Sequence, residues 1–149
     1  MIDSSVLWQY SLFDGLEQTQ IDSILPLMEQ EVYDAGSEII VEGGHNDKIH
    51  FIVEGLVAVI KNGVTLDQLR EGIFFGEMEV LDILPVEATI KAMVTTRVLT
   101  LSIDSLGELY ENELQTYSFI LMNLARDISR RLRRMNTIVT KESPLMEWS

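Results

Sequence analysis

Short alternating apolar runs, separated by turn residues, fill the middle of this 149-residue chain and constrain its fold more than any other feature. The predicted strands are Glu31–Tyr33, Glu38–Val41, Ile49–Glu54, Leu56–Ile60, Val64–Leu69, Thr89–Ala92 and Val98–Ser102. Many short strands at this spacing are typical of an all-β sandwich or barrel. We therefore expect a jelly roll, or double-stranded β-helix, over about residues 31–102. Asn62-Gly63 between two of the runs predicts a hairpin with both central residues at positive φ.

A short amphipathic helix is predicted before the strands. Its apolar positions follow the i, i+3, i+4, i+7 spacing and are Ile21, Ile24, Leu25 and Met28. Thr19 is the expected N-cap, and Pro26 weakens the last turn. After the strands, Asp104 is expected to cap a second short helix over Ser105–Tyr110.

A longer helix is predicted from about Leu114 to Thr137. Its apolar stripe consists of Leu114, Tyr117, Leu121, Leu124, Ile128, Leu132 and Met135, with Phe119 and Ile120 beside it. Spacings of three and four keep such a stripe on one face of a nearly straight helix. We expect part of the stripe to cover the sheet and the outer part to pack on the same helix of a second copy, giving a homodimer. The expected class is α+β, mainly β, with one domain over residues 1–137 and a tail over 138–149 that contains Trp148.

Charge and composition argue against a nucleic acid-binding protein, a secreted protein and a membrane-spanning protein. The formal net charge is −13, which should repel nucleic acid and anionic lipid. The chain has no cysteine, no basic signal-peptide flank after Met1 and no apolar run long enough to span a bilayer. A cytoplasmic location without membrane association is therefore expected.

Five arginines form a basic cluster late in the sequence: Arg126, Arg130, Arg131, Arg133 and Arg134. They could form a stripe for nucleic acid. The alternative, which the negative net charge favours, is that they complement the helix macrodipole at a C-terminus and face an acidic surface.

The segment Gly76–Thr89 joins a Gly-Glu pair, a short apolar turn and a Pro-x-x-Ala-Thr tail. Together with the runs Gly36–Gly43 and Ile49–Val59, it resembles the cyclic nucleotide-binding domain of catabolite-activator-type regulators, protein kinase A regulatory subunits and nucleotide-gated channels. The resemblance extends over about residues 11–136. Glycines fall at its turns, where positive φ or close backbone approach is needed. They are Gly36, Gly43, Gly55, Gly72 and Gly76.

The resemblance implies a ligand cassette made of Gly76, Glu77, Met78, Glu79, Val86, Glu87, Ala88 and Thr89. Gly76 would let the backbone turn so that N–H groups face an anion, and Glu77 matches the family glutamate that accepts a bond from the ribose hydroxyl. Three positions depart from the pattern. Val86 stands where the family has the phosphate-binding arginine. Glu79 stands in place of a small residue, and Glu87 in place of a small or hydroxyl residue that can touch the ligand.

Several alternatives stay open at the cassette. Glu77 could instead cap the backbone of its turn. Val86 could point into the core while Lys91 or Arg97 supplies the missing charge. Glu77 and Glu79 could bind a divalent cation through oxygen. No resident metal or cofactor is otherwise expected.

The sequence predicts a regulatory domain rather than an enzyme. His45 and His50 are the only histidines in the sequence, and the catalytic motifs of hydrolases and nucleoside triphosphatases are absent. The residues after Thr137 are too few for a helix-turn-helix, so direct DNA binding is not expected. We expect a stand-alone cyclic nucleotide-binding-like sensor that contacts a protein effector and has weak or lost nucleotide affinity. The alternative is a working cyclic AMP or cyclic GMP receptor that holds phosphate through backbone N–H groups.

Overall fold

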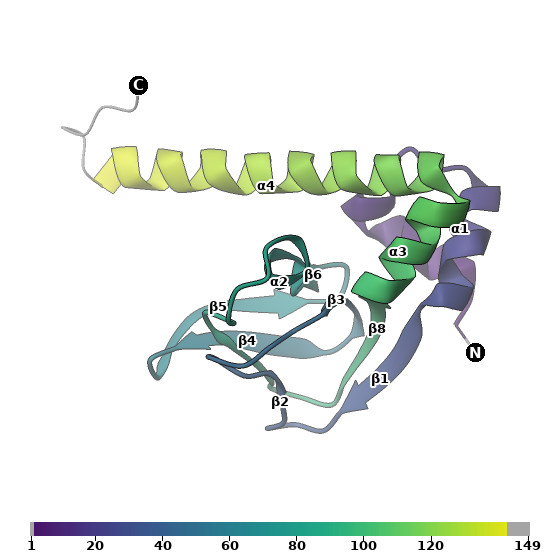
Figure 1. The fold of residues 1–149 in the computed structure, drawn as a ribbon. Helices are drawn as coiled ribbons and strands as arrows, with labels where there is room; N and C mark the ends of the chain where they lie inside the picture. Colours follow the sequence, from purple (N-terminus) through teal and green to yellow (C-terminus); the bar gives the residue numbers. More distant parts are fainter. Residues whose placement is uncertain (1, 143–149) are drawn as a thin grey trace.

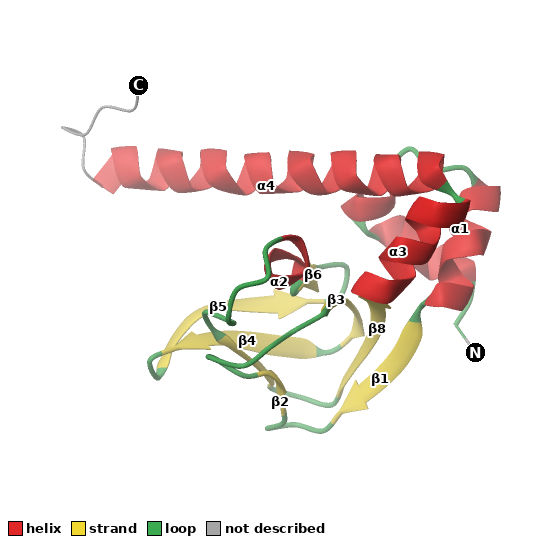
Figure 2. Ribbon diagram, viewed as in Figure 1, coloured by secondary structure: helices red, strands yellow, loops and turns green. Residues whose placement is uncertain are grey.

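Two antiparallel sheets and a helical layer make up the molecule in the computed structural model, which describes residues 2–142 (Figure 1). The helices are η1 Ser4–Gln9, η2 Ser11–Phe13, α1 Gln18–Ile24, η3 Leu25–Leu27, α2 Glu77–Leu81, α3 Ile103–Asn112 and α4 Leu114–Glu142. The strands are β1 Glu29–Tyr33, β2 Glu38–Ile40, β3 Lys48–Glu54, β4 Leu56–Lys61, β5 Val64–Arg70, β6 Phe74–Phe75, β7 Thr89–Ala92 and β8 Thr96–Ser102. The strand order is β1-β8-β3-β6 in one sheet and β2-β7-β4-β5 in the other, which confirms the predicted β-roll (Figure 2).

Strand β3 shows why alternating residues produce this architecture. Ile49 and Phe51 point to the helical layer, where they join a core with Leu7, Ile120 and other apolar side chains. Ile52 points the other way, into a second core between the two sheets. Successive strand residues face opposite sides of a sheet, so a strand with apolar residues on both faces must be covered twice.

The turns follow the predicted glycine and asparagine positions. Asn62 has φ 51° and Gly63 has φ 78°, so the hairpin between β4 and β5 is confirmed. Gly55 has φ 127°, and a Cβ there would lie 2.5 Å from the Thr96 hydroxyl oxygen. Any larger residue at position 55 would push β8 away from the β3–β4 connection.

The predicted N-cap of the first helix was wrong, whereas the predicted weakening of its last turn at Pro26 is confirmed. The N-cap of α1 is Glu17, not Thr19, and it forms a capping box with Gln20. A carboxylate and an amide three residues apart satisfy two backbone N–H groups, which a threonine inside the first turn does not. The α-helical part ends at Ile24, and Pro26 lies in the tighter helix η3.

The N-cap of α3 and the strand β6 also differ from expectation. The cap of α3 is Ser102, which accepts a hydrogen bond from the Ser105 amide, while Asp104 lies in the first turn. The two-residue strand β6 was not predicted, because Phe74 and Phe75 are too short a run to show alternation.

Helix α4 continues past the predicted end at Thr137 to Glu142. Its N-terminal half packs on the domain, with Ile120 and Leu124 buried and Asn123 donating hydrogen bonds to the carbonyls of Leu12 and Asp14. Beyond this half the helix extends over the cassette (Figure 1). The rest of the predicted tail, with Trp148, lies outside the described residues.

The face that α4 buries differs from the predicted stripe. Ile120, expected beside the stripe, is fully buried, whereas Leu114, Leu132 and Met135 are more than half exposed.

Among the described residues, no helix is long and apolar enough to cross a bilayer.

Candidate functional site

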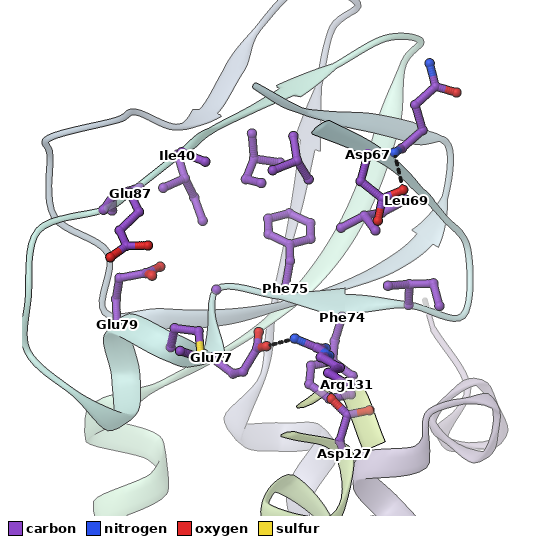
Figure 3. A pocket seen from close by; sticks show the side chains of 18 of the residues that line it. Ile40, Asp67, Leu69, Phe74, Phe75, Glu77, Glu79, Glu87, Asp127 and Arg131 are labelled. Atoms are coloured by element: carbon purple, nitrogen blue, oxygen red, sulfur yellow. Dashed lines mark hydrogen bonds and ion pairs between the residues drawn. The ribbon is translucent and has the colours of Figure 1, made fainter. Parts of the chain in front are cut away.

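A cavity of about 1040 Å³ lies between the cassette, the β4–β5 hairpin and α4 (Figure 3). Its apolar floor comes from the core between the sheets: Ile40, Phe75, Val86 and Ile90. Among its residues up to 138, helix α4 lines the cavity with Asp127, Arg131, Arg134, Met135 and Ile138. The cassette residues Gly76 to Glu79 and Val86 to Ala88 also line it, so the structure brings almost all predicted site residues together.

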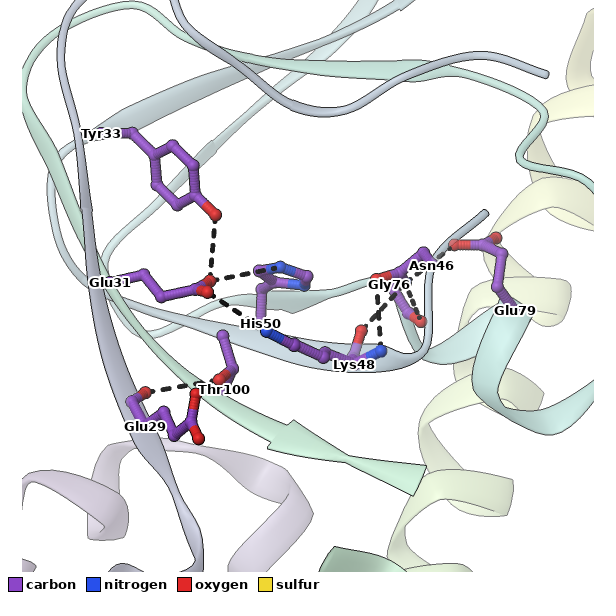
Figure 4. Close-up of polar contacts among 9 residues, drawn as sticks. All are labelled: Glu29, Glu31, Tyr33, Asn46, Lys48, His50, Gly76, Glu79 and Thr100. Atoms are coloured by element: carbon purple, nitrogen blue, oxygen red, sulfur yellow. Dashed lines mark hydrogen bonds and ion pairs between the residues drawn. The ribbon is translucent and has the colours of Figure 1, made fainter. Parts of the chain in front are cut away.

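Gly76 sets the geometry of the cassette. It is the N-cap of α2 with φ 88°, and a Cβ there would lie 2.7 Å from the Lys48 carbonyl oxygen. The Asn46 amide nitrogen donates to the carbonyls of Lys48 and Gly76, both at 2.9 Å, and to the Glu79 carboxylate at 3.2 Å (Figure 4). Asn46 therefore fixes the cassette turn to strand β3.

Glu77 is held by an arginine that the sequence reasoning did not assign to the site. The Glu77 side chain is only 2% exposed, and its carboxylate accepts a hydrogen bond from the Arg131 guanidinium of α4. Arg131 also lies 2.8 Å from the Asp127 carboxylate and 5.5 Å from the centre of the Phe74 ring. A buried carboxylate needs such a partner, because burial without one disfavours its charge. The backbone-capping role considered for Glu77 is not its observed contact.

Val86 points into the core between the two sheets and is only 5% exposed. Its backbone is fixed by two hydrogen bonds to the Gly43–Gly44 turn. The side chain has no donor for an anion. The two rescue candidates lie elsewhere, since Arg97 pairs with Glu54 and Lys91 is on β7 outside the cavity lining.

Carboxylates outnumber guanidiniums around the cavity. Its lining includes Asp67, Glu71, Glu77, Glu79, Asp82, Glu87 and Asp127, against Arg70, Arg131 and Arg134. Burial raises the pKa of the Glu79 carboxyl, and the neighbouring charges of Glu77 and Glu87 add to this rise, while the Asn46 hydrogen bond opposes it. An anion placed in the cavity would be repelled by each of these carboxylates.

The remaining predicted site residues have smaller roles. Met78 lines the cavity but is largely exposed, and Ala88 contributes a small surface beside Glu87. Thr89 does not line the cavity. Its hydroxyl accepts a hydrogen bond from the Glu42 amide at 2.9 Å and so joins β7 to the turn after β2.

His50 lies beneath the cassette without facing the cavity. Its ring stacks on Phe75 at 4.9 Å, and its Nε2 lies 4.0 Å from a Glu31 carboxylate oxygen (Figure 4). Desolvation lowers the pKa of His50 to about 4, although the charge of Glu31 opposes the shift. Within the described residues, no cluster of three or more His, Cys, Asp or Glu is placed to hold a metal ion.

Helical periodicity gives a partial signal for Arg131 in the sequence. Arg131 follows the buried Leu124 by seven residues, so both lie on the same face of α4. The arginine cluster does not lie at the helix C-terminus, because α4 continues to Glu142. The macrodipole interpretation of the cluster was therefore wrong, and the expected acidic surface is, for Arg131, the cassette of its own chain.

The two stacked sheets, the glycine-led cassette and the helix that follows define a cyclic nucleotide-binding fold. The model of the cyclic nucleotide-binding domain family matches residues 30–113, and the chain belongs to this family. Longer proteins that contain a similar domain include a potassium/sodium hyperpolarization-activated cyclic nucleotide-gated channel and a catabolite activator protein.

Curated relatives match nearly the whole chain but only part of their own length. Glutaminase 2 of Bradyrhizobium diazoefficiens is 30% identical over 138 residues, which is 92% of this chain and 22% of the relative. The human potassium/sodium hyperpolarization-activated cyclic nucleotide-gated channel 4 is 30% identical over 128 residues, 86% of this chain and 11% of the channel. The chain thus spans about a fifth or less of these proteins.

Solved structures share the fold. A cyclic nucleotide-binding domain from Methylobacillus flagellatus has a TM-score of 0.83 at 23% identity and covers 97% of this chain and 84% of its own. The catabolite activator protein of Thermus thermophilus has a TM-score of 0.77 at 27% identity, covering 89% and 63%. The regulatory subunit of a cAMP-independent protein kinase A from Trypanosoma brucei has a TM-score of 0.72 at 18% identity, covering 83% and 44%.

Proposed function

We propose that this chain is a regulatory sensor domain whose affinity for cyclic nucleotides is weak or lost, and which acts through a protein effector or another small ligand. The observation that carries the proposal is the burial of Val86 in the core, at the position where the family resemblance calls for a phosphate-binding arginine. A charge-assisted hydrogen bond to phosphate contributes about 1.5–3 kcal/mol, and a bidentate arginine makes two.

The charges around Val86 support the same conclusion. Glu79 and Glu87 line the cavity close to it, and each would repel a phosphodiester by about 1–4 kcal/mol, depending on local solvation. Glu77, the carboxylate that would accept the ribose hydroxyl, is already paired with Arg131. Together these effects predict a loss of several kcal/mol, or about a thousandfold or more in affinity.

Calorimetric titration with cyclic AMP and cyclic GMP tests the proposal directly. We expect no binding tighter than about 10 μM for either nucleotide. Tighter binding would overturn the proposal.

A gain-of-function variant makes the test sharper. The Trypanosoma brucei subunit was solved bound to cAMP as a triple mutant in which a glutamate became alanine, and the residues seven and eight positions later became arginine and alanine. Glu79, Val86 and Glu87 have the same spacing in this chain. The variant E79A/V86R/E87A should therefore gain cyclic AMP affinity by at least about a hundredfold. E79A/V86L/E87A, which removes the same acids without adding the guanidinium, is its matched control and should gain much less.

The second candidate is a working cyclic AMP or cyclic GMP receptor that holds the phosphate through backbone N–H groups of the cassette. Arg131 favours this reading, because it brings a guanidinium to the cavity. The same guanidinium is neutralised by Glu77 and Asp127, so the first candidate has more support. If Arg131 held phosphate, wild-type protein would bind cyclic nucleotide and Arg131→Met would abolish that binding.

We also propose a homodimer through α4. Leu114, Leu132 and Met135 are more than half exposed and Leu121 is half-buried, so an apolar strip remains along the helix after it has packed on its own domain. Tyr117 and Ile128, also predicted for the dimer, are half-buried because they pack against the domain core. Leu124 is excluded from this strip because it is buried in the domain core. The net charge of −13 argues against direct contact with DNA.

A further inference from the structure

We propose that the cassette cavity binds a cationic ligand, an ammonium or guanidinium group on a compact apolar body, with the cation seated between Glu79 and Glu87. The inference rests on the proposed function, since it names the class of small ligand that a cavity unsuited to phosphate would accept. It changes the expected ligand from an anion to a cation while keeping the same cavity.

The cavity already holds one cationic group. The Arg131 guanidinium lies between the carboxylates of Glu77 and Asp127 and over the face of Phe74, 5.5 Å from the ring centre. Two carboxylates and an aromatic face are a common environment for a buried guanidinium. The protein therefore shows, at one end of the cavity, the kind of group that its lining stabilises.

The other end of the cavity also carries two carboxylates. Figure 3 shows the carboxylates of Glu79 and Glu87 pointing toward each other, at the end of the cavity away from Arg131. Glu79 is half-buried, and its carboxylate accepts a hydrogen bond from the neutral Asn46 amide. Two facing carboxylates repel each other, and a cation between them would remove that repulsion.

The apolar floor indicates the kind of molecule that bears the cationic group. Ile40, Phe75, Val86 and Ile90 present buried hydrocarbon below the two carboxylates. A pocket with an apolar floor and a few convergent charged groups is the usual form of a small-molecule site. A hydrated metal ion would leave this floor unfilled, and the described residues supply no group of three or more metal ligands. An organic cation fits both the floor and the carboxylates.

The test uses three phenyl probes of nearly equal size: phenethylamine, a cation at neutral pH; phenethyl alcohol, which is neutral; and hydrocinnamate, an anion. Titration calorimetry is done at about 150 mM salt, where exposed charges are largely screened beyond about 8 Å. We expect the wild-type protein to bind the amine at least about tenfold more tightly than the alcohol, and the anion not at all.

Matched variants separate the site from the general negative field. E79Q/E87Q should weaken amine binding by at least about tenfold. E108Q/E111Q removes the same charge from exposed positions on α3, outside the cavity, and should leave the affinity unchanged. Because Glu87 is exposed, the single variant E87Q keeps the test valid should the double variant fold poorly.

Each outcome decides one of the two proposals. Equal binding of amine and alcohol, retained amine affinity in E79Q/E87Q and in E87Q, or no amine binding would overturn the cationic-ligand inference. If the amine fails and cyclic nucleotides also fail, the inference is wrong but the proposed loss of nucleotide affinity stands. If cyclic AMP binds tightly to the wild-type protein, the proposed function is wrong whatever the amine does.

Discussion

Strand β3 and the cassette helix α2 lie next to each other but are held in different ways. β3 pairs with β8 on one side and β6 on the other, and its side chains fill two apolar cores. The cassette is held by Asn46 and by the ion pair between Glu77 and Arg131. The sheets, which form the frame of the domain, therefore depend on apolar volume and on the alternation of side chains. The cassette site depends instead on a few charged groups that come from distant parts of the sequence.

The largest effect is expected where the frame is broken. Phe51 is fully buried and contacts the rings of Tyr10, Phe13 and Phe74. Phe51→Ala should lower the free energy of unfolding by about 3–5 kcal/mol, because it removes apolar contacts and leaves a cavity. Urea denaturation measures this loss. Val64→Ala on the exposed strand β5 is the control and should change stability by less than about 0.5 kcal/mol.

The next effect concerns pH at the boundary between the two regions. The pKa of His50 is lowered to about 4 in the folded protein from 6.5, so between these values the unfolded state binds more protons. The contribution of His50 to stability is complete above pH 6.5 and falls as the pH drops toward 4. Between neutral pH and about 4.5, the wild-type protein should lose about 2–3 kcal/mol more than His50→Phe, which keeps the ring but cannot titrate. Denaturation curves at several pH values give the difference. Equal slopes for the two proteins would contradict it.

A smaller effect is expected at the cassette itself. Arg131→Met leaves the carboxylate of Glu77 buried without its cation. Because Arg131 is about one-third exposed, with a side-chain exposure of 36%, we expect a loss of only about 1–3 kcal/mol rather than the larger cost of a fully buried pair. Pairing this variant with Glu77→Gln should recover part of the loss. The exposed Arg134→Met is the control for charge on α4.

The smallest change in stability, with a change in assembly, is expected on the outer side of α4. Leu114→Gln and Leu132→Gln alter exposed side chains, so each should change the unfolding free energy by less than about 0.5 kcal/mol. Together they should convert a dimer into a 17.0 kDa monomer in sedimentation experiments. A wild-type protein that already sediments as a monomer at high concentration would refute the dimer.

The sequence was sufficient for the frame but not for the site. Alternation and turn glycines are local signals, so they predicted seven of the eight strands that the structure describes to within one or two residues at each end. The role of Arg131 was missed because its partner Glu77 is 54 residues away in the sequence, and only the path of α4 brings them together. The buried direction of Val86 was left open for the same reason, since it depends on the turn at Gly43–Gly44 that holds its backbone.

Helix α4 also has a mechanical consequence. It is anchored near Asn123 and continues for nineteen residues to Glu142, a distance of about 28 Å at the usual rise per residue. Were the anchor to act as a pivot, a tilt of about 10° would move the far end by about 5 Å. Because the helix extends so far beyond Asn123, a displacement at Arg131 too small to disturb the sheets would become a larger displacement at Glu142.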